Sequence, residues 1–521
     1  MNIIDVLIEQ SPALIIAIPL LGAFLMPLIS RINSTLRNIF GLLVLCLTGF
    51  FVGILASDVL ANGPRLYIFG AKDLAVPMVR ILFEVDSMSI FMALITMVLA
   101  FIALIYSWSF MKDHDGLDKY YTLVLLLITS TLGMELTGDI FNFFVFLEIS
   151  CIASCALIAF WISEGEALEA AFKYIVVSAI GALFVLFAIG MLYAQYNALN
   201  IATLANVLKY TFLDKIILVL LLVVLGMKAG LVPMHMWLPD SYGRAPPSVT
   251  LIIMGATLAS FYGVLRVIFT LYGNVLSTTM RFSIPLNVLV GWILITLAII
   301  SIIVGVAMAL VQSDFMRLIG FSAVAEVGYM FLAIGAGIAA LGTPYATTAL
   351  QGGILHLLND ALDIGLLFLV AGAVYYITKK RSLDDISGLA RNMKYTTVFF
   401  VIGLLAVAGM PPLNGFASKF LIYESVYQLN PILSIVAILC SILMLAVFVK
   451  VFYAVFMGPE LPAFKNVTEA PRSMLIAMGL VAALVIFIGL FPNLVIDALV
   501  KPAANALLNH AQYIGTVVGG I

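Results

Sequence analysis

The chain has 521 residues, of which 64% are hydrophobic and only 10% are charged, and its formal net charge is −2. Because soluble domains carry about 25% charged residues, this composition excludes a soluble globular protein and predicts a polytopic membrane protein. The nearly balanced charge gives no indication of nucleic-acid binding. No basic residue precedes the first apolar run, so we expect a first spanning helix rather than a cleaved signal peptide.

Apolar runs long enough to cross a bilayer recur along the whole chain, and we count about fourteen of them. They cover approximately 12–29, 38–58, 87–109, 119–138, 140–162, 170–195, 215–236, 246–272, 286–311, 317–340, 346–378, 395–428, 431–457 and 473–492. If the odd-numbered connections are cytoplasmic, they hold roughly twice as many Lys and Arg residues as the others, which places both termini outside.

The first polar cluster, at 135–148, interrupts two of these runs. Glu148 lies well inside an apolar helix, where a carboxylate stays ionised only beside a cation. We expect that cation to be Lys228, and the alternative is a structural ion pair that fixes two helices. Asp139 is expected to cap the following helix, with proton relay as its second possible role. Glu135 is either a proton access point or a water-facing helix end.

The stretch 225–240 places Lys228 in an apolar helix, five residues before Pro233. Burying an ammonium in a bilayer costs about 2.5–3.5 kcal/mol on insertion scales, so such a lysine normally has a carboxylate or a polar path beside it. Proline frees backbone carbonyls, which are tolerated at membrane depth only where they face protein or water. We therefore predict an ion-translocation site at Lys228, with His235 as a possible relay.

The third region holds Glu326, His356, Asp360 and Asp363 in otherwise apolar helices. His356 and Asp360 are four residues apart and share one helix face. Histidine titrates near neutrality and suits proton relay. We expect Glu326, His356 and Asp360 to carry ions, with Asp363 as a possible relay. Just before this region Asp314 and Arg317 flank a loop, where we expect a local pair or a cap.

A second interrupted helix contains Pro411-Pro412, followed by Gly415 and Lys419. Lys419 follows the unwound segment and is expected to face a hydrated cavity, whereas the alternative is a lysine that reaches the interface from a helix end. The two interruptions, at Pro233 and at Pro411-Pro412, lie five helices apart. Equivalent broken helices in two halves indicate an internal repeat with an ion pathway at the breaks.

Five stretches together resemble a known family. They are Gly-Asp-Ile-Phe-Asn-Phe-Phe-Val-Phe-Leu-Glu at 138–148, the lysine–proline stretch 228–242 with Ala-Pro-Pro-Ser-Val at 245–249, and the segments 312–322, 385–393 and 409–419. In this order, over about 85–460, they resemble the antiporter-like subunits of respiratory complex I. The same family includes the D subunit of Mrp-type sodium/proton antiporters and the membrane subunits of energy-converting hydrogenases.

The resemblance implies an all-α polytopic membrane protein with about fourteen transmembrane helices. It implies two inverted five-helix repeats, helices 4–8 and 9–13, with helices 7 and 12 broken. The expected division is 1–115 for helices 1–3, 116–272 and 273–460 for the two repeats, and 461–521 for helix 14 and an interfacial tail. The short segment after helix 14 favours the Mrp D or hydrogenase branch over the complex I subunit that carries a long lateral helix.

The departures from the family pattern concern the centre of the expected relay. No lysine occurs between Lys228 and Lys379, although the family usually has one in helix eight. Asp360 and Ile364 stand at the positions of the family's helix-eleven histidine and lysine, and Glu326 stands where a histidine is common. The relay has therefore lost cations and gained carboxylates. This pattern allows a carboxylate relay, a sodium path with oxygen ligands, or a half-active copy.

The four cysteines do not indicate a metal or cluster site. Only Cys151 and Cys155 are close in sequence, and their spacing on one apolar helix fits neither zinc nor iron–sulfur ligation. No motif binds a nucleotide or flavin, so we expect no cofactor in this chain. Partner subunits, including sister antiporter-like subunits, are expected to supply energy through iron–sulfur or other redox centres.

We therefore expect a proton- or sodium-translocating, antiporter-like subunit of a multisubunit respiratory or Mrp-type complex in a prokaryotic cell membrane. The subunit itself is expected to be non-catalytic within a redox-driven oxidoreductase complex. A structural subunit with an incomplete ion pathway is the alternative. A secondary transporter for organic solutes is disfavoured, because no set of aromatic and polar side chains marks a binding pocket.

Overall fold

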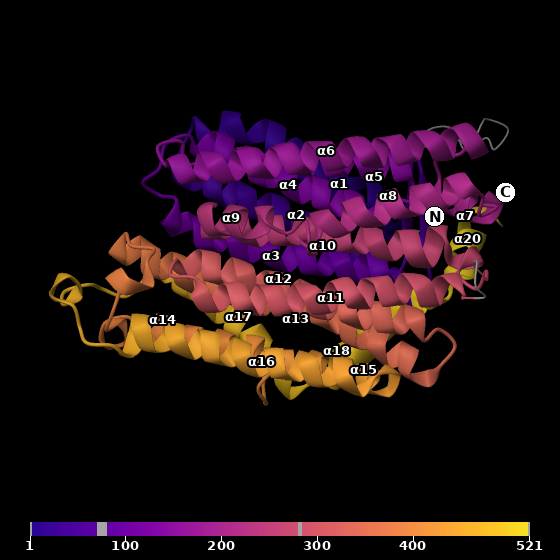
Figure 1. The fold of residues 1–521 in the computed structure, drawn as a ribbon. Helices are drawn as coiled ribbons and strands as arrows, with labels where there is room; N and C mark the ends of the chain where they lie inside the picture. The colour runs from indigo at the N-terminus through magenta and orange to yellow at the C-terminus, as the bar shows by residue number, and fades with distance from the viewer. Residues whose placement is uncertain (1–2, 70–80, 280–283, 519–521) are drawn as a thin grey trace.

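The computed structural model describes residues 3–69, 81–279 and 284–518. Long helices lie side by side with roughly parallel axes, and both termini are at the same end of the bundle (Figure 1). Among the described residues, eleven helices are long and apolar enough to cross a membrane. The protein is therefore a mostly helical, multi-pass membrane protein, as its composition predicts.

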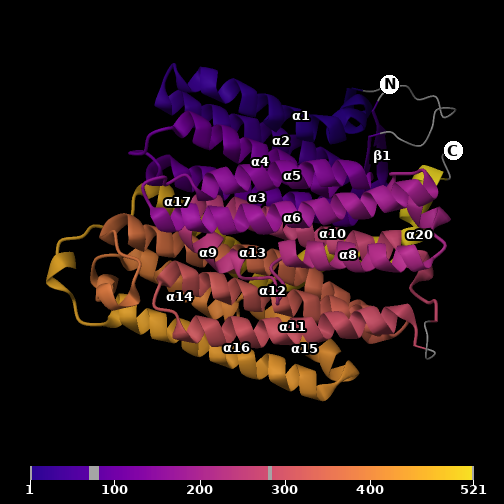
Figure 2. The same cartoon turned by 45° about the horizontal axis from the view of Figure 1, so that its top comes forward.

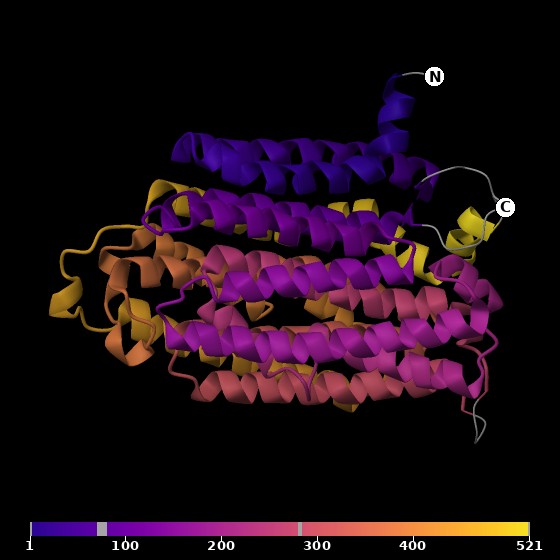
Figure 3. The ribbon, with the colours of Figure 1, turned by 90° about the horizontal axis from the view of Figure 1, so that it is seen from above.

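The N-terminal part forms one edge of the bundle. Helices α1 (Ile3–Ser30) and α2 (Ser34–Asn62) pack against each other and stand at the margin when the bundle is viewed from above (Figure 3). Strands β1 (Arg65–Ile68) and β2 (Leu82–Val85) form an antiparallel pair with Arg65 opposite Val85. Helix α3 (Ser87–Phe110) then enters the interior.

The next segment of the bundle runs through α4 to α10. Its elements are α4 (Leu117–Leu136), α5 (Ile140–Ile158), α6 (Gly165–Tyr196), α7 (Ile201–Val207), α8 (Phe212–Lys228), α9 (Trp237–Arg244) and α10 (Pro247–Leu265). Helix α10 continues into a π-helical turn, η1 (Arg266–Leu271), and the short η2 (Gly273–Val275). A capping box of Thr211 and Asp214 begins α8, and Pro233 lies in the gap between α8 and α9.

The segment after it contains α11 to α16. Its elements are α11 (Leu286–Val311), α12 (Phe315–Ala339), α13 (Pro344–Thr378), η4 (Leu383–Asp385), η5 (Leu389–Arg391), α14 (Lys394–Val407), α15 (Asn414–Leu429), α16 (Pro431–Val451), η6 (Phe452–Met457) and η7 (Pro462–Phe464). Pro411 and Pro412 lie between α14 and α15. Both prolines lack an amide donor and crowd the preceding turn, which ends a helix.

The C-terminal part returns along the bundle. It consists of α17 (Arg472–Leu490), α18 (Pro492–Val495), η8 (Ile496–Val500), α19 (Lys501–Leu508) and α20 (His510–Val518). Helix α17 packs against α3 and α13, α19 also contacts α3, and α20 contacts α7 and η1. The chain therefore ends beside the α4–α10 segment, as the turned view also shows (Figure 2).

Two helices at the contact between the halves are surrounded by protein. The span Pro247–Leu271 is buried throughout and Phe315–Ala339 is buried except at Arg317 and Ala339, whereas α1, α2 and α16 expose much of their surface. Helix α12 packs against α9, α11 and α13, and α10 packs against α3 and α13. Charged residues on these central helices are consequently shielded from lipid, where an isolated charge would be costly.

Candidate functional site

Lys228, the last residue of α8, stands at the first helix break. Only 5% of the residue is exposed. Its Nζ donates to the Cys151 Sγ on α5 at 2.6 Å and lies 5.5 Å from the centroid of the Tyr174 ring. The ammonium therefore has a thiol and an aromatic face as its direct neighbours.

Glu148, the expected partner of Lys228, is half-buried on α5 and forms no direct ion pair with it in the described structure. Cys151, one helical turn further along α5, takes the direct contact instead. The carboxylate nevertheless remains near enough to act on Lys228 through its charge. The sequence indicated no role for Cys151 beyond helix packing. Its contact with Lys228 depends on the direction in which the side chain points, and residue spacing does not specify that direction.

The residues of the first break have identifiable backbone partners. Gly230 adopts a positive φ of 85°, and the amide of Val232 donates to the Ser301 Oγ on α11 at 3.1 Å. Across the gap, the Trp237 indole donates to the Met227 carbonyl at 3.0 Å. His235 lies in the same gap, buried, and neither ring nitrogen has a hydrogen-bond partner among the described residues. The freed groups thus face protein, as a break at membrane depth requires.

Lys419 on α15 is the centre of the second site. Its Nζ donates to the Glu326 Oε1 on α12 at 2.9 Å and to the carbonyl of Val407, the last residue of α14, at 2.6 Å. The Tyr329 ring centroid lies 4.4 Å away. Lys419 and Glu326 are 1% and 2% exposed, so the ion pair is formed away from lipid and water.

His356 on α13 extends this pair. Its Nε2 lies 3.0 Å from the Glu326 Oε2, and its Nδ1 shares a hydrogen bond of 3.0 Å with the Ser418 hydroxyl. The Asn359 amide donates to the same hydroxyl at 2.9 Å. Glu326 therefore bridges a lysine and a histidine, an arrangement in which one proton can be held on either side of the carboxylate.

Asp360 and Asp363 lie on the same helix as His356 and are also buried. One oxygen of each carboxylate has no hydrogen-bond partner among the described residues. The Asp363 side chain approaches Gly415, at the beginning of α15, where an added Cβ would be 3.2 Å from Oδ2. The structure thus brings Glu326, His356 and Lys419 into direct contact and leaves the two aspartates alongside.

Glu135 and Asp139 lie apart from both breaks. Asp139 caps α5 by accepting from the Asn142 amide at 2.8 Å, as the sequence predicts. Glu135 accepts from the Thr96 hydroxyl at 2.7 Å, and its other oxygen has no partner among the described residues. Since Glu135 is 0% exposed, the alternative of a water-facing helix end is wrong.

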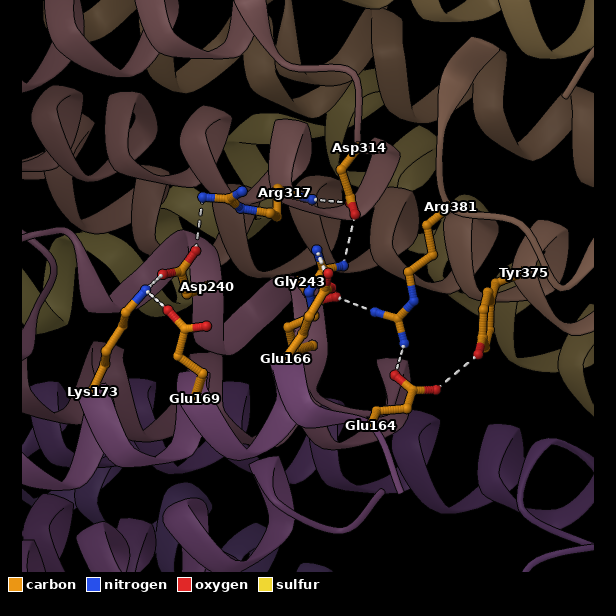
Figure 4. Close-up of polar contacts among 11 residues, drawn as sticks. Glu164, Glu166, Glu169, Lys173, Asp240, Gly243, Asp314, Arg317, Tyr375 and Arg381 are labelled. Atoms are coloured by element: carbon orange, nitrogen blue, oxygen red, sulfur yellow. Dashed lines mark hydrogen bonds and ion pairs between the residues drawn. The ribbon is translucent and has the colours of Figure 1, made fainter. Parts of the chain in front are cut away.

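An ion-pair network that sequence analysis missed joins the two halves at one end of the bundle (Figure 4). Asp240, just beyond the first break, pairs with Lys173 and with Arg317, each at 2.9 Å. The other links are Arg244 to Asp314 at 2.6 Å, Arg381 to Glu164 at 2.8 Å, and the Tyr375 hydroxyl to Glu164 at 3.1 Å. Asp314 caps α12, as expected, by accepting a hydrogen bond from the Arg317 amide at 3.0 Å. The Arg317 side chain forms its ion pair with Asp240 instead of Asp314.

A cavity of about 370 Å³ adjoins the first break between α8 and α11. Met227, Val232, Pro233 and Leu294 are among its mostly apolar lining residues. In the described ranges, no group of three or more His, Cys, Asp or Glu side chains is arranged to hold a metal ion. The side chains in contact at the two breaks include ammonium groups, a carboxylate, an imidazole and a thiol.

The sequence matches the models of two known protein families. Residues 137–445 match the family described as "NADH:quinone oxidoreductase/Mrp antiporter, TM", and residues 77–121 match the N-terminal family of complex I chain 5. The chain is 31% identical to the N subunit of the NADH-quinone oxidoreductase of Desulforudis audaxviator, over 94% of this chain and 98% of that one. It is 30% identical to the D subunit of the Na(+)/H(+) antiporter of Bacillus subtilis, over 96% and 98%.

A solved structure is similar over nearly the full length. The match is to a chain of the membrane-bound sulfane sulfur reductase, an archaeal respiratory membrane complex, with a TM-score of 0.86 and 27% identity. It covers 98% of this chain and 100% of that one. The fold described above is therefore one found in a multisubunit respiratory assembly.

Proposed function

Because the chain belongs to the NADH:quinone oxidoreductase/Mrp antiporter family, we propose that it moves protons or sodium ions as an antiporter-like subunit of a multisubunit membrane complex. The observation that carries the proposal is the buried contact of Lys419, Glu326 and His356. A carboxylate between an ammonium and an imidazole in a water-poor interior can exchange a proton with either neighbour. A purely apolar bundle has no need for such a group.

The proposed pathway links the two helix breaks. Glu148 modulates the charge state of Lys228, and the ion passes toward the second half through Glu326, His356 and Asp360 to Lys419. His235 and Asp363 are further relay candidates, because each is buried and has an unsatisfied polar atom among the described residues. Oxygen ligands from the same carboxylates would also suit a hard cation such as sodium.

The proposed topology has fourteen crossings in two inverted five-helix repeats. Eleven helices are long and apolar enough to span, and α4, α8 and the α14–α15 pair bring the number to fourteen. The repeats would be α4–α10 and α11–α16, and both termini would lie outside. The matching positions of the two breaks, each in the fourth crossing of its repeat, support this assignment.

The proposed partners are other membrane subunits, including sister antiporter-like subunits, since the relatives and the similar structure come from such assemblies. This chain would couple ion movement to chemistry performed elsewhere and would not itself be catalytic. Redox centres, where the complex has them, would lie on partner subunits. The lipid-exposed surfaces of α2 and α16 fit a subunit embedded in a prokaryotic cell membrane.

Transport by the native complex tests this proposal. The complex would be purified through a tag on this chain, reconstituted into vesicles and driven by its own substrate or by an imposed ion gradient. We expect Lys228→Ala to assemble normally and to reduce coupled ion movement to background, while Lys501→Ala, which removes an exposed lysine, leaves it unchanged. Normal transport in the Lys228 variant would refute the role of the first break.

The alternative is a structural subunit with an incomplete pathway. One observation favours it: Ile364, at the place where the family usually has a lysine, is apolar and fully buried. In that case neither Lys228→Ala nor Lys419→Ala would alter transport, and only assembly would respond to changes in this chain. Measuring transport and complex yield on the same preparations separates the two functions.

A further inference from the structure

A second buried charge cluster lies at the end of the bundle that holds both termini. It contains Glu84 on β2, Asp86 at the beginning of α3, Arg266 in η1 and Tyr513 on α20; we call it the Glu84 cluster. Arg266 is 4% exposed and pairs with Asp86. Its guanidinium also lies 4.6 Å from the centroid of the Tyr513 ring. None of these residues belongs to the pathway described above.

Glu84 differs from its neighbours because it is buried without a partner. It is 0% exposed, and neither carboxylate oxygen has a hydrogen-bond partner among the described residues. Burial raises the pKa of Glu84 well above its usual range, and the negative charge of Asp86 raises this pKa further. The Arg266 guanidinium and the Tyr513 hydroxyl act in the opposite direction and lower it, but less than burial raises it. Asp86 has an ion pair with Arg266, whereas Glu84 has none among the described residues, and it is therefore the acid on which the inference rests.

A cavity of about 220 Å³ lies on the outer side of this cluster. Asp86 and Tyr513 belong to its lining, together with Asn505, Asn509 and Gln512 from the C-terminal helices. A water molecule occupies about 30 Å³ in the liquid and needs two to four polar partners, and this lining offers them. The cavity can therefore hold several waters next to the residues that contact Glu84.

The inner side of the cluster leads to Glu135. The Glu84 carboxylate packs directly on Gly138, where an added Cβ would lie 3.2 Å from Oε2. Gly138 follows the end of α4, three residues after Glu135. Glu135 is also fully buried with one oxygen unpartnered among the described residues. Two buried carboxylates, each with at least one unpartnered oxygen among the described residues, thus follow each other from the cavity toward the interior of the bundle.

We propose that the Glu84 cluster is a proton port, in which Glu84 exchanges protons with water in the cavity and passes them to and from Glu135. In the inward direction a hydronium ion protonates the Glu84 carboxylate and leaves water, and the resulting carboxylic acid then protonates the Glu135 carboxylate. The step needs no oxidant, reductant or metal. This inference rests on the proposed function and adds a route to water that is separate from the two helix breaks.

The test compares four variants of the native complex in vesicles. Glu84→Gln removes the exchangeable proton with little change of shape, and Tyr513→Phe removes only the hydroxyl at the cavity. Glu424→Gln, at an exposed carboxylate near the end of α15, is the matched control, and Lys228→Ala reports on the proposed function itself. Transport rates are measured together with the infrared carbonyl band of protonated carboxylic acids.

We expect Glu84→Gln to slow proton movement at least tenfold, as loss of a proton-transfer group commonly does, and to remove one carboxylic-acid band. Tyr513→Phe should slow transport less, and Glu424→Gln should match the unmodified complex. Full transport by Glu84→Gln, with Lys228→Ala inactive, would overturn the port alone, whereas full transport by both would overturn the proposed function. If Glu84→Gln fails to assemble, an unaltered rate in Tyr513→Phe overturns the port.

Discussion

The two helix breaks have the same backbone and different charges. Gly230 and Gly409 both adopt positive φ, 85° and 72°, and a cis proline follows each of them three residues later. The residue after each glycine donates an amide hydrogen bond back to a carbonyl of the preceding helix. Leu231 donates to the Gly226 carbonyl and Met410 donates to the Leu405 carbonyl, each at 2.9 Å. This helix ending satisfies carbonyls that a proline-broken helix would otherwise leave free.

The lysines reach the two breaks from opposite directions. Lys228 precedes Gly230 by two residues, and the corresponding position before Gly409 is Val407. No cation is present there, but Lys419, from the helix after the break, donates to the carbonyl of Val407. A helix C-terminus attracts a cation because its last carbonyls carry partial negative charge. The break thus creates a place for an ammonium, and either half-helix can supply it.

The partners of the two ammonium groups also differ. Lys419 has a carboxylate and, through it, a histidine in direct contact, whereas Lys228 has a thiol and an aromatic ring. The second site therefore places a carboxylate and an imidazole in direct contact, which the proposed proton exchange requires. At the first site the direct contact is with a thiol, and the carboxylate of Glu148 forms no ion pair with Lys228 among the described residues.

Removing the second ammonium should have the largest effect. Lys419→Met would leave Glu326 buried without its cation, at a cost of about 3–5 kcal/mol if the carboxylate stayed charged, so Glu326 should take up a proton instead. We expect complete loss of ion transport in vesicles with the complex still assembled. Lys450→Met, at an exposed lysine near the end of α16, serves as the control, and a transporting Lys419 variant would show that the second break is not a functional site.

A carboxylate relay between the breaks predicts an intermediate effect. Glu326→Gln and Asp360→Asn should each slow transport, because an amide cannot exchange a proton, and the double variant should be slower than either. The same vesicle assay, repeated with and without sodium, would show whether the carboxylates serve protons or a hard cation. Full activity of the double variant would exclude the relay and leave the two breaks functionally unconnected.

The smallest expected effect concerns the two glycines. Alanine in the left-handed conformation costs about 1–2 kcal/mol, and the neighbours add to this unequally. At Gly230 an added Cβ would lie 2.4 Å from the Leu238 Cδ1, whereas at Gly409 it would lie 3.0 Å from the Lys419 Cδ.

We therefore expect Gly230→Ala to lower the thermal unfolding temperature of the purified protein more than Gly409→Ala. Gly53→Ala is the control, because an added Cβ there meets nothing within 4 Å and alanine favours a helix. Equal losses at both breaks would mean that the surroundings of the two glycines are equivalent, contrary to the unequal contacts described above.

The sequence alone was sufficient to identify residues whose burial costs free energy. Lys228, Glu326, His356 and Lys419 stand out because charged or titratable groups in apolar helices need a reason, and the capping role of Asp139 follows from a local pattern. The membrane class follows from composition. The breaks split α8 from α9 and α14 from α15, which is why two of the apolar runs in the sequence do not form long continuous helices.

The features that sequence missed depend on contacts between distant residues. Cys151 replaces Glu148 beside Lys228 because of side-chain direction on one helix turn, which spacing does not specify. Glu84 belongs to a short strand and meets Arg266 only through the fold. The pairs of Arg381 with Glu164 and of Arg244 with Asp314 join positions 217 and 70 residues apart, and nothing near either residue indicates its partner.

Those long-range pairs have a consequence for the way the protein is made. A membrane protein is synthesised and inserted from its N-terminus, so Glu164, Lys173 and Arg244 are made before Asp314, Arg317 and Arg381 exist. Within the first half Lys173 pairs with Glu169 and Asp240, and Arg244 pairs with Glu166, whereas the contacts of Glu164 with Arg381 and of Asp240 with Arg317 form only later. Packing of α12 and of the segment after α13 against the first half completes these ion pairs. The full ion-pair network therefore forms only when the second half is in its correct position.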